Sequence, residues 1–202
     1  MATPKHPKNE IRPSVFDKPT AKSDVAIVVE GRRLYVNKAI LSTASDVFDR
    51  MLNGDFKEQQ QAEIPLPGKS RDDIVDMLLC IYPSELRPVT RETVDKLLEL
   101  ADEYQIVGLK RRCEEFLLPL CKTSIYEHVH DCNDTVHFLY LADKYELETL
   151  LEIATDTLSN VSINQIRYGF SIANHEDYTK LSSRGLAKLL RKRVDYLEKR
   201  KH

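Results

Sequence analysis

The chain has 202 residues, of which 42% are apolar and 31% charged. This composition excludes disordered, fibrous and collagen-like classes and fits one or two globular domains. No apolar run is long enough for a membrane-spanning helix, and the first residues lack the apolar core of a signal peptide. The net charge of −2 is uneven, with +3 over residues 1–23, +7 over residues 180–202 and −12 between them. An acidic body argues against nucleic acid as the main partner.

The first 22 residues hold four prolines among polar side chains. Frequent proline leaves no room for a helix, and no apolar period replaces it. Residues 1–22 are therefore predicted to be a flexible lead-in, with Val15 and Phe16 as the only candidate anchors.

A β-hairpin is predicted next. The β-branched run Val25–Val29 is typical of a strand buried on both faces. Glu30, Gly31 and Arg32 form a turn in which glycine accepts an unusual backbone geometry, and residues 33–36 return as the second strand.

Two short helices should follow. Asn37 can cap one that holds Ile40 and Leu41. Ser45 or Asp46 can cap the second, which Gly54 ends. Its apolar residues share one face at helical spacing: Val47, Phe48, Met51 and Leu52.

An edge strand and a longer helix complete this half of the chain. Pro65 cannot donate to a sheet ladder, so residues 63–66 are predicted to be an edge strand. Ser70 opens a helix that runs to Ile81, and Pro83 closes it.

The second half is helical and contains a repeat. Thr90 opens a helix, Gly108 separates it from a helix over residues 109–117, and Pro119 is expected to end that one. The segment 97–104, with the sequence LLELADEY, aligns with 138–145, FLYLADKY, at an offset of 41. This similarity predicts two helical hairpins that stack side by side.

A last helix is predicted over residues 183–199. Its apolar residues are predicted to share one face, and Leu189, Val194 and Leu197 are expected to pack inward; the face comprises Leu186, Leu189, Leu190, Val194 and Leu197.

The ordered motifs carry a family resemblance. The run from Ser23-Asp24-Val25 through the hairpin to residues 36–48, with Leu98–Ile106 and Cys113-Glu114, resembles a BTB (POZ) domain over residues 23–120. Residues 122–202 are similar to the BACK-like, or three-box, helical extension of cullin-recruiting members. The resemblance implies an α+β fold, a small β-sheet flanked by helices, followed by an all-α extension.

Two positions depart from the family pattern. The usual His is Asn37 here, which removes a packing or hydrogen-bond contact near the dimer region. The usual Tyr-Thr-Gly is replaced by Tyr82-Pro83-Ser84, which re-aims a loop.

The resemblance also implies a function and its residues. In cullin-3-binding BTB domains an apolar-x-Glu motif docks on the cullin, and Phe56-Lys57-Glu58 occupies that place. Phe56 would be the rigid apolar anchor, Glu58 would orient it, and Tyr82 would present an aromatic ring to the same partner. The alternative is that Phe56 covers its own core.

Asp24 is implied to lie partly buried near a two-fold dimer interface. A carboxylate in that environment needs a partner, and Arg32, Arg33 and Lys38 are the candidates. The alternative is an aspartate at a strand start that caps its own turn.

No catalytic constellation is present, because the glycines form no phosphate loop and no nucleophile elbow occurs. The protein is therefore predicted not to be an enzyme and to need no cofactor. Donors suited to zinc gather at His128, His130, Cys132 and His137, with Cys121 nearby, but their spacing matches no paired-ligand pattern and favours a polar connector without metal. Cys80 and Cys113 fit small core positions.

The basic tail has two interpretations. Residues 191–193 and 199–202 could be a nuclear import signal or a nucleic-acid contact. The alternative interpretation is that these residues lie near the C-terminus of a helix, where the helix dipole favours positive charge.

These observations predict a protein that works by binding. The expected partners are a second copy of the chain, cullin-3 and substrate proteins that the sequence does not identify, in a homodimeric substrate adaptor of a cullin-3 RING ubiquitin ligase. The alternative is a BTB scaffold or oligomerisation protein without cullin binding, for example in transcriptional regulation. No membrane contact is expected, and the cytoplasm is the predicted location, with the nucleus as the alternative.

Overall fold

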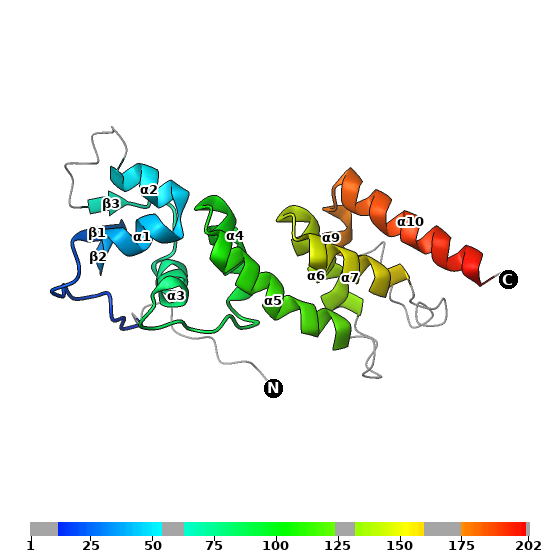
Figure 1. Ribbon diagram of the computed structural model, residues 1–202, viewed down its shortest axis with the longest axis horizontal. Helices are drawn as coiled ribbons and strands as arrows, with labels where there is room; N and C mark the ends of the chain where they lie inside the picture. Colours follow the sequence, from blue (N-terminus) through cyan, green and yellow to red (C-terminus); the bar gives the residue numbers. More distant parts are fainter. Residues whose placement is uncertain (1–11, 54–62, 124–131, 160–174, 201–202) are drawn as a thin grey trace. The chain divides into compact units, whose positions relative to one another are not determined.

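The computed structural model describes residues 12–53, 63–123, 132–159 and 175–200 (Figure 1). The chain forms two compact units. The first contains residues up to 88 together with 99–109, and the second contains residues 89–98 together with those from 110 on.

The first unit is built on a three-stranded sheet in the order β2-β1-β3. The central strand β1 (Val25–Val29) pairs antiparallel with β2 (Arg32–Val36) and parallel with β3 (Glu63–Pro65). Glu30 and Gly31 both have positive φ in the hairpin turn, as a tight two-residue turn of this kind requires. The predicted hairpin and the predicted edge strand are both confirmed.

Helices α1 (Lys38–Ala44), α2 (Asp46–Asn53) and α3 (Arg71–Ile81) begin at the caps that the sequence predicts. Asn37 accepts from the N–H of the residue three positions on, and Ser45 and Ser70 do the same. Each cap satisfies an N–H group that the first turn leaves without a partner. Of the two candidates for the second helix, Ser45 is the cap.

The core of this unit lies between the sheet and the helices. Ile27 pairs with Leu34 on one side and with Ile64 on the other, so one row of buried aliphatic side chains crosses all three strands. The ring of Phe48 stacks on Tyr104 at 4.7 Å between centroids, and Ser45 Oγ donates to the Tyr104 carbonyl, which fixes α2 to the turn that follows α4.

Helices α4 (Val94–Glu103) and α5 (Val107–Thr123) form one hairpin, and α6 (Cys132–Lys144) and α7 (Glu148–Ser159) form another. The predicted repeat is visible in the backbone. Gln105 and Glu146 both have positive φ, at 52° and 55°. In each turn the N–H two residues after the tyrosine donates to the carbonyl of the alanine at 101 or 142, at 2.8 and 2.9 Å.

Two predictions about α5 are wrong. Gly108 lies in its first turn and does not precede it, and Pro119 lies inside the helix, which continues to Thr123. A proline inside a helix withdraws its own N–H from the ladder, and its ring crowds the carbonyl four residues earlier. The helix past Pro119 contributes the fully buried Cys121 to the core, and such packing offsets the lost hydrogen bond.

The second unit ends in α9 (Glu176–Thr179) and α10 (Ser183–Lys199), and α10 packs along α7 (Figure 1). The predicted last helix is confirmed, but its predicted inward face is only partly right. Leu189 is buried, whereas Leu190, Val194 and Leu197 are exposed.

Candidate protein-interaction site

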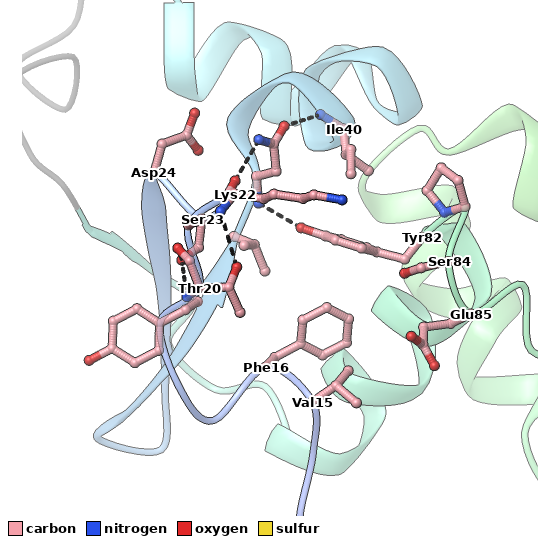
Figure 2. A pocket seen from close by; sticks show the side chains of 15 residues that line it. Val15, Phe16, Thr20, Lys22, Ser23, Asp24, Ile40, Tyr82, Ser84 and Glu85 are labelled. Atoms are coloured by element: carbon pink, nitrogen blue, oxygen red, sulfur yellow. Dashed lines mark hydrogen bonds between the residues drawn. The ribbon is translucent and has the colours of Figure 1, made fainter.

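The lead-in segment forms one wall of a pocket in the first unit. The pocket has a volume of about 660 Å³ and lies between residues 15–24, the end of β2, the start of α1 and the end of α3 (Figure 2). Two residues that the sequence assigned to different interfaces, Asp24 and Tyr82, both line it.

Residues 12–22 differ from the flexible lead-in expected from their prolines. Phe16 is 3% exposed and its carbonyl accepts from the Tyr35 N–H at 2.8 Å, so the segment is tied to β2. Of the two candidate anchors, Phe16 is buried and Val15 is 58% exposed. Residues 1–11 lie outside the described ranges.

A buried arginine also holds the segment. The Arg71 side chain is 4% exposed, pairs with Asp17 and donates to the Arg12 carbonyl at 3.0 Å. Burial would raise the pKa of Asp17, but the Ser14 N–H and Arg71 outweigh it and the pKa is lowered. Sequence reasoning missed this anchor because Arg71 and Asp17 lie 54 positions apart.

Tyr82 follows α3 and points into the pocket (Figure 2). Its hydroxyl accepts from the Asn37 N–H at 2.6 Å, and its ring meets Phe16 edge-on at 4.8 Å. Burial raises the pKa of Tyr82, and the nearby Asp24 carboxylate adds to the shift, so the hydroxyl stays neutral. The tyrosine thus fixes both the lead-in and the start of α1.

Asp24 is exposed in the single chain, where the resemblance implied partial burial, and it receives a backbone partner. Its Oδ1 accepts from the Lys38 N–H at 2.7 Å, at the positively polarised start of α1. Of the side chains expected to pair with it, Arg33 instead pairs with Glu63 at 2.6 Å. The Asn37 side chain caps α1 and donates to the Lys22 carbonyl at 2.7 Å.

The family model described as BTB/POZ domain matches residues 15–119, more than half of the chain. The chain belongs to the BTB/POZ family. The matched span begins at Val15, so it includes most of the ordered lead-in. A BTB domain is a protein-interaction module, so this part of the chain indicates protein–protein interaction.

This BTB protein is similar to longer proteins that also contain a BTB domain. It is 28% identical to BTB and MATH domain-containing protein 36 of Caenorhabditis elegans over 91% of this chain and 52% of that protein. Kelch-like protein 23 of Mus musculus is 32% identical over 42% of this chain and 15% of the relative. The chain spans about half the length of the first of these relatives and less of the second.

Among solved structures, the BTB domain of human gigaxonin is similar, with 27% identity and a TM-score of 0.39. The similarity covers 47% of this chain and 77% of that chain.

Two of the predicted cullin-binding residues of the BTB domain, Phe56 and Glu58, lie outside the described residues. The structure therefore brings Asp24 and Tyr82 together and does not place the motif. What joins Asp24 to Tyr82 is the backbone of residues 37 and 38, whose N–H groups bond to Tyr82 and Asp24.

The cluster of zinc donors is only partly described. His128 and His130 lie outside the described ranges, and so does the side chain of Cys132. His137 lies between two carboxylates, with Nδ1 2.7 Å from Asp177 and Nε2 3.0 Å from Asp95. Within the described ranges no group of three His, Cys, Asp or Glu side chains is arranged to hold a metal.

His137 is stabilised as a cation. The hydrogen bond to Asp95 is the largest cause that raises its pKa to about 9, the bond to Asp177 adds to the shift, and burial opposes both. The histidine therefore links α4, α6 and α9 of the second unit as a charged group.

Much of the positive charge after the BTB domain is used inside the second unit. Arg184 pairs with Glu148, Lys188 contacts Glu152 at 2.9 Å, and Lys192 contacts Asp156 at 2.8 Å. Each side of this ladder is spaced four residues apart, which places its members on one helix face. Lys188 and then Lys192 hydrogen-bond Glu152 and lower its pKa to about 2.

Three cysteines of the described chain, Cys80, Cys113 and Cys121, are buried thiols that form no disulfide. The prediction of small core residues at Cys80 and Cys113 is confirmed. Burial is the main cause that raises the pKa of Cys121 to about 11, so its thiol is protonated at neutral pH. In the parts of the chain that the structure describes, no helix is both long and apolar enough to cross a bilayer.

Proposed function

We propose that the protein is a homodimeric adaptor that brings substrate proteins to a cullin-3 RING ubiquitin ligase. The observation that carries the proposal is the run Phe56-Lys57-Glu58 within a chain that belongs to the BTB family. BTB domains that bind cullin-3 share an apolar-x-Glu motif at this position. A large aromatic side chain is also the residue type that dominates protein interfaces.

The elements on both sides of the motif support this assignment. Before it, α2 is fixed by the stack of Phe48 on Tyr104. After it, Ile64 of β3 pairs with Ile27 in the middle of the sheet. The described residues on both sides of the motif are therefore anchored in the core of the first unit.

We assign Tyr82 a supporting role in the same function. Its hydroxyl is bonded to the Asn37 N–H and its ring is half-buried, so it would contribute the ring and not the hydroxyl to a partner. Replacing Tyr82 by Phe should then leave cullin binding within about threefold of wild type, because only the hydroxyl is lost.

We infer that two copies meet near Asp24. The side chain is exposed in the single chain, so a second copy can reach it, and Lys38 N–H satisfies one of its oxygens. A symmetric dimer presents two cullin-binding motifs, which raises avidity without new contacts. Light scattering of the purified protein should give twice the mass of the chain, and a monomeric mass at micromolar concentration would contradict the dimer.

Calorimetric titration with the N-terminal region of cullin-3 tests the adaptor function. The double variant Phe56→Ala, Glu58→Ala should weaken binding by about 30-fold or more, because hot-spot residues contribute about 2 kcal/mol or more each. Lys57→Ala is the matched control inside the same segment and should change binding little.

Equal affinity of the wild-type chain and the double variant would contradict the motif. No measurable binding of wild type would instead favour the scaffold function without cullin, in which the BTB domain only oligomerises.

A further inference from the structure

Helix α10 carries an exposed apolar stripe. Leu190, Val194 and Leu197 are 57%, 53% and 41% exposed. Their spacing of four and three residues places them on one face of the helix. The other exposed large apolar residues of the described chain are Val15, Leu86 and Val107, which come from three separate segments, so α10 alone gathers such residues into a surface.

The opposite side of α10 is fixed, so the stripe stays outward. Leu189 and Gly185 are buried, and the ladder of Arg184, Lys188 and Lys192 binds α10 to α7. Ser182, the cap of α10, donates its N–H and hydroxyl to Asp143 at 2.6 and 2.7 Å. Turning the stripe inward would break these contacts.

One edge of the stripe presents two ordered guanidinium groups. Arg193 and Arg200 lie three residues after Leu190 and Leu197, and their Cζ atoms lie 5.8 and 5.7 Å from the centroid of the Tyr196 ring. Arg200 also donates to the Tyr196 hydroxyl at 3.3 Å, and Arg193 donates to the Ser159 carbonyl at 2.7 Å. Guanidinium groups held in place can bind carboxylates in two-pronged fashion at a reduced cost in entropy.

The charge that remains on this surface is positive. Within the described ranges Arg191 and Arg200 form no ion pair, whereas Arg184, Lys188 and Lys192 are neutralised by α7. An acidic ligand is therefore the electrostatic complement of the outward side of α10.

The shape and edges of the stripe favour a protein helix over a lipid or nucleic-acid surface. It extends over roughly 10 Å, two helical turns, and contains no aromatic residue. Its second edge carries Arg191 and Glu198, whose opposite charges offset each other, so this edge offers no continuous basic surface to the phosphates of a membrane or a nucleic acid. A partner helix can place an acidic edge on Arg193 and Arg200 and avoid acids opposite Glu198.

We propose that the outward face of α10, formed by Leu190, Val194, Leu197, Arg193 and Arg200, docks an acidic amphipathic helix of a partner protein. The apolar stripe supplies the contact area and the arginine pair selects the acidic edge. This site is independent of the adaptor function, because it uses no residue of the BTB domain and does not require cullin-3.

Fluorescence anisotropy with the full chain tests the proposal. The probe is a labelled synthetic helical peptide with leucines three and four residues apart on one face and glutamates at its edges. A peptide of the same composition in scrambled order is its control. The triple variant Leu190→Ser, Val194→Ser, Leu197→Ser should weaken probe binding at least about tenfold, since each apolar contact contributes to burial.

A charge variant and a matched surface variant complete the experiment. Arg193→Gln with Arg200→Gln should also weaken binding about tenfold and reduce its dependence on salt. Val107→Ser removes an exposed apolar residue outside α10 and should leave binding unchanged. If circular dichroism finds the triple variant unfolded, the single substitution Leu197→Gln replaces it and should weaken binding about threefold.

Several results would overturn the proposal. These are equal binding of the scrambled peptide, unchanged binding by the stripe or arginine variants, or no binding of the probe. Titrations with phosphatidylserine vesicles and duplex DNA, and light scattering of the chain alone, cover the other occupants. A further outcome is that the probe fails to bind while the chain binds vesicles or DNA or self-associates, and that the triple variant abolishes this interaction. In that case the occupant of the α10 face is a lipid surface, a nucleic acid or a second copy of the chain.

Discussion

The two helical hairpins share a backbone and differ in what their surfaces carry. Both turns use a tyrosine followed by a residue with positive φ, Gln105 or Glu146. At three equivalent positions α5 has Val107, Arg111 and Glu115, whereas α7 has Glu148, Glu152 and Asp156. Arg111 pairs with Glu115 on its own helix at 3.6 Å, while the α7 carboxylates bind α10. The local sequence sets the hairpin, and its surface charges select whether another helix binds.

The shared turn should be equally important in both hairpins. Ile106 and Leu147 occupy equivalent positions and are 2% and 3% exposed. Ile106→Ala and Leu147→Ala should each lower the free energy of unfolding by about 2–4 kcal/mol, because each removes buried apolar volume. Urea denaturation followed by circular dichroism measures both. A loss below about 1 kcal/mol at only one position would break the equivalence.

Two glycine substitutions should have opposite signs. A Cβ at Gly185 would lie 2.6 Å from the Asp143 carboxyl carbon, and Asp143 cannot move without releasing Ser182. Gly185→Ala should therefore destabilise the protein by about 1–3 kcal/mol, as overpacking does. Gly108 lies in α5 with open space around it, so Gly108→Ala should stabilise by about 0.5–1 kcal/mol. Urea denaturation measures both changes in the free energy of unfolding. A Gly185→Ala variant that is as stable as Gly108→Ala would contradict the docking of α10 on Asp143.

The second hairpin should lose stability at alkaline pH through His137, at the position where the first hairpin has Lys96. The folded protein holds the His137 proton up to a pKa of about 9, above the ordinary value of 6.5. Its contribution is complete below about pH 6.5 and is lost as the pH rises through 9. After a discount for partial exposure it amounts to about 1–2 kcal/mol.

Urea midpoints measured from pH 6 to 10 test this dependence. His137→Gln should flatten the decrease between pH 6.5 and 9, because Gln cannot carry the proton. Asp95→Asn should reduce the decrease in part, since Asp177 still binds the imidazole. A variant with an unchanged slope would assign the pH dependence to other groups.

The charge ladder should contribute least, because its side chains are partly exposed and solvent screens their charges. Glu152→Lys places a third cation beside Lys188 and Lys192 and should cost about 1 kcal/mol at low salt. The further changes Lys188→Glu and Lys192→Glu should recover most of that loss. Glu115→Lys on α5 is the matched control and should cost less than about 0.5 kcal/mol. If Glu152→Lys costs no more than this control, the ladder does not hold α10.

Local signals predicted the fold well because their causes are local. The caps at Asn37, Ser45 and Ser70 depend on residues three positions on, and the edge strand follows from one proline. Pro119 misled because the packing of the helix beyond it decides the outcome, and no short-range signal reports that packing.

The candidate site was harder to predict, since its geometry depends on distant residues. The sequence named Asp24 and Tyr82 but separated them, and their common frame comes from bonds to residues 38 and 37 across 14 and 45 positions. Arg71 escaped notice because a buried arginine at a helix start resembles a solvated one in sequence. Periodicity predicts that the stripe on α10 faces the core, because it shows that a helix face is apolar. It does not show whether another element covers that face.

Pro65 on the outer strand has a consequence for how this protein meets others. In β3 the neighbouring Leu66 N–H donates to the Val28 carbonyl, so the backbone position of Pro65 faces away from β1 and offers no donor there. An incoming strand would lack a ladder hydrogen bond at this position, which disfavours extension of the sheet and fibril-like stacking at this border. Recognition on that flank is therefore expected to depend more on side chains than on backbone pairing.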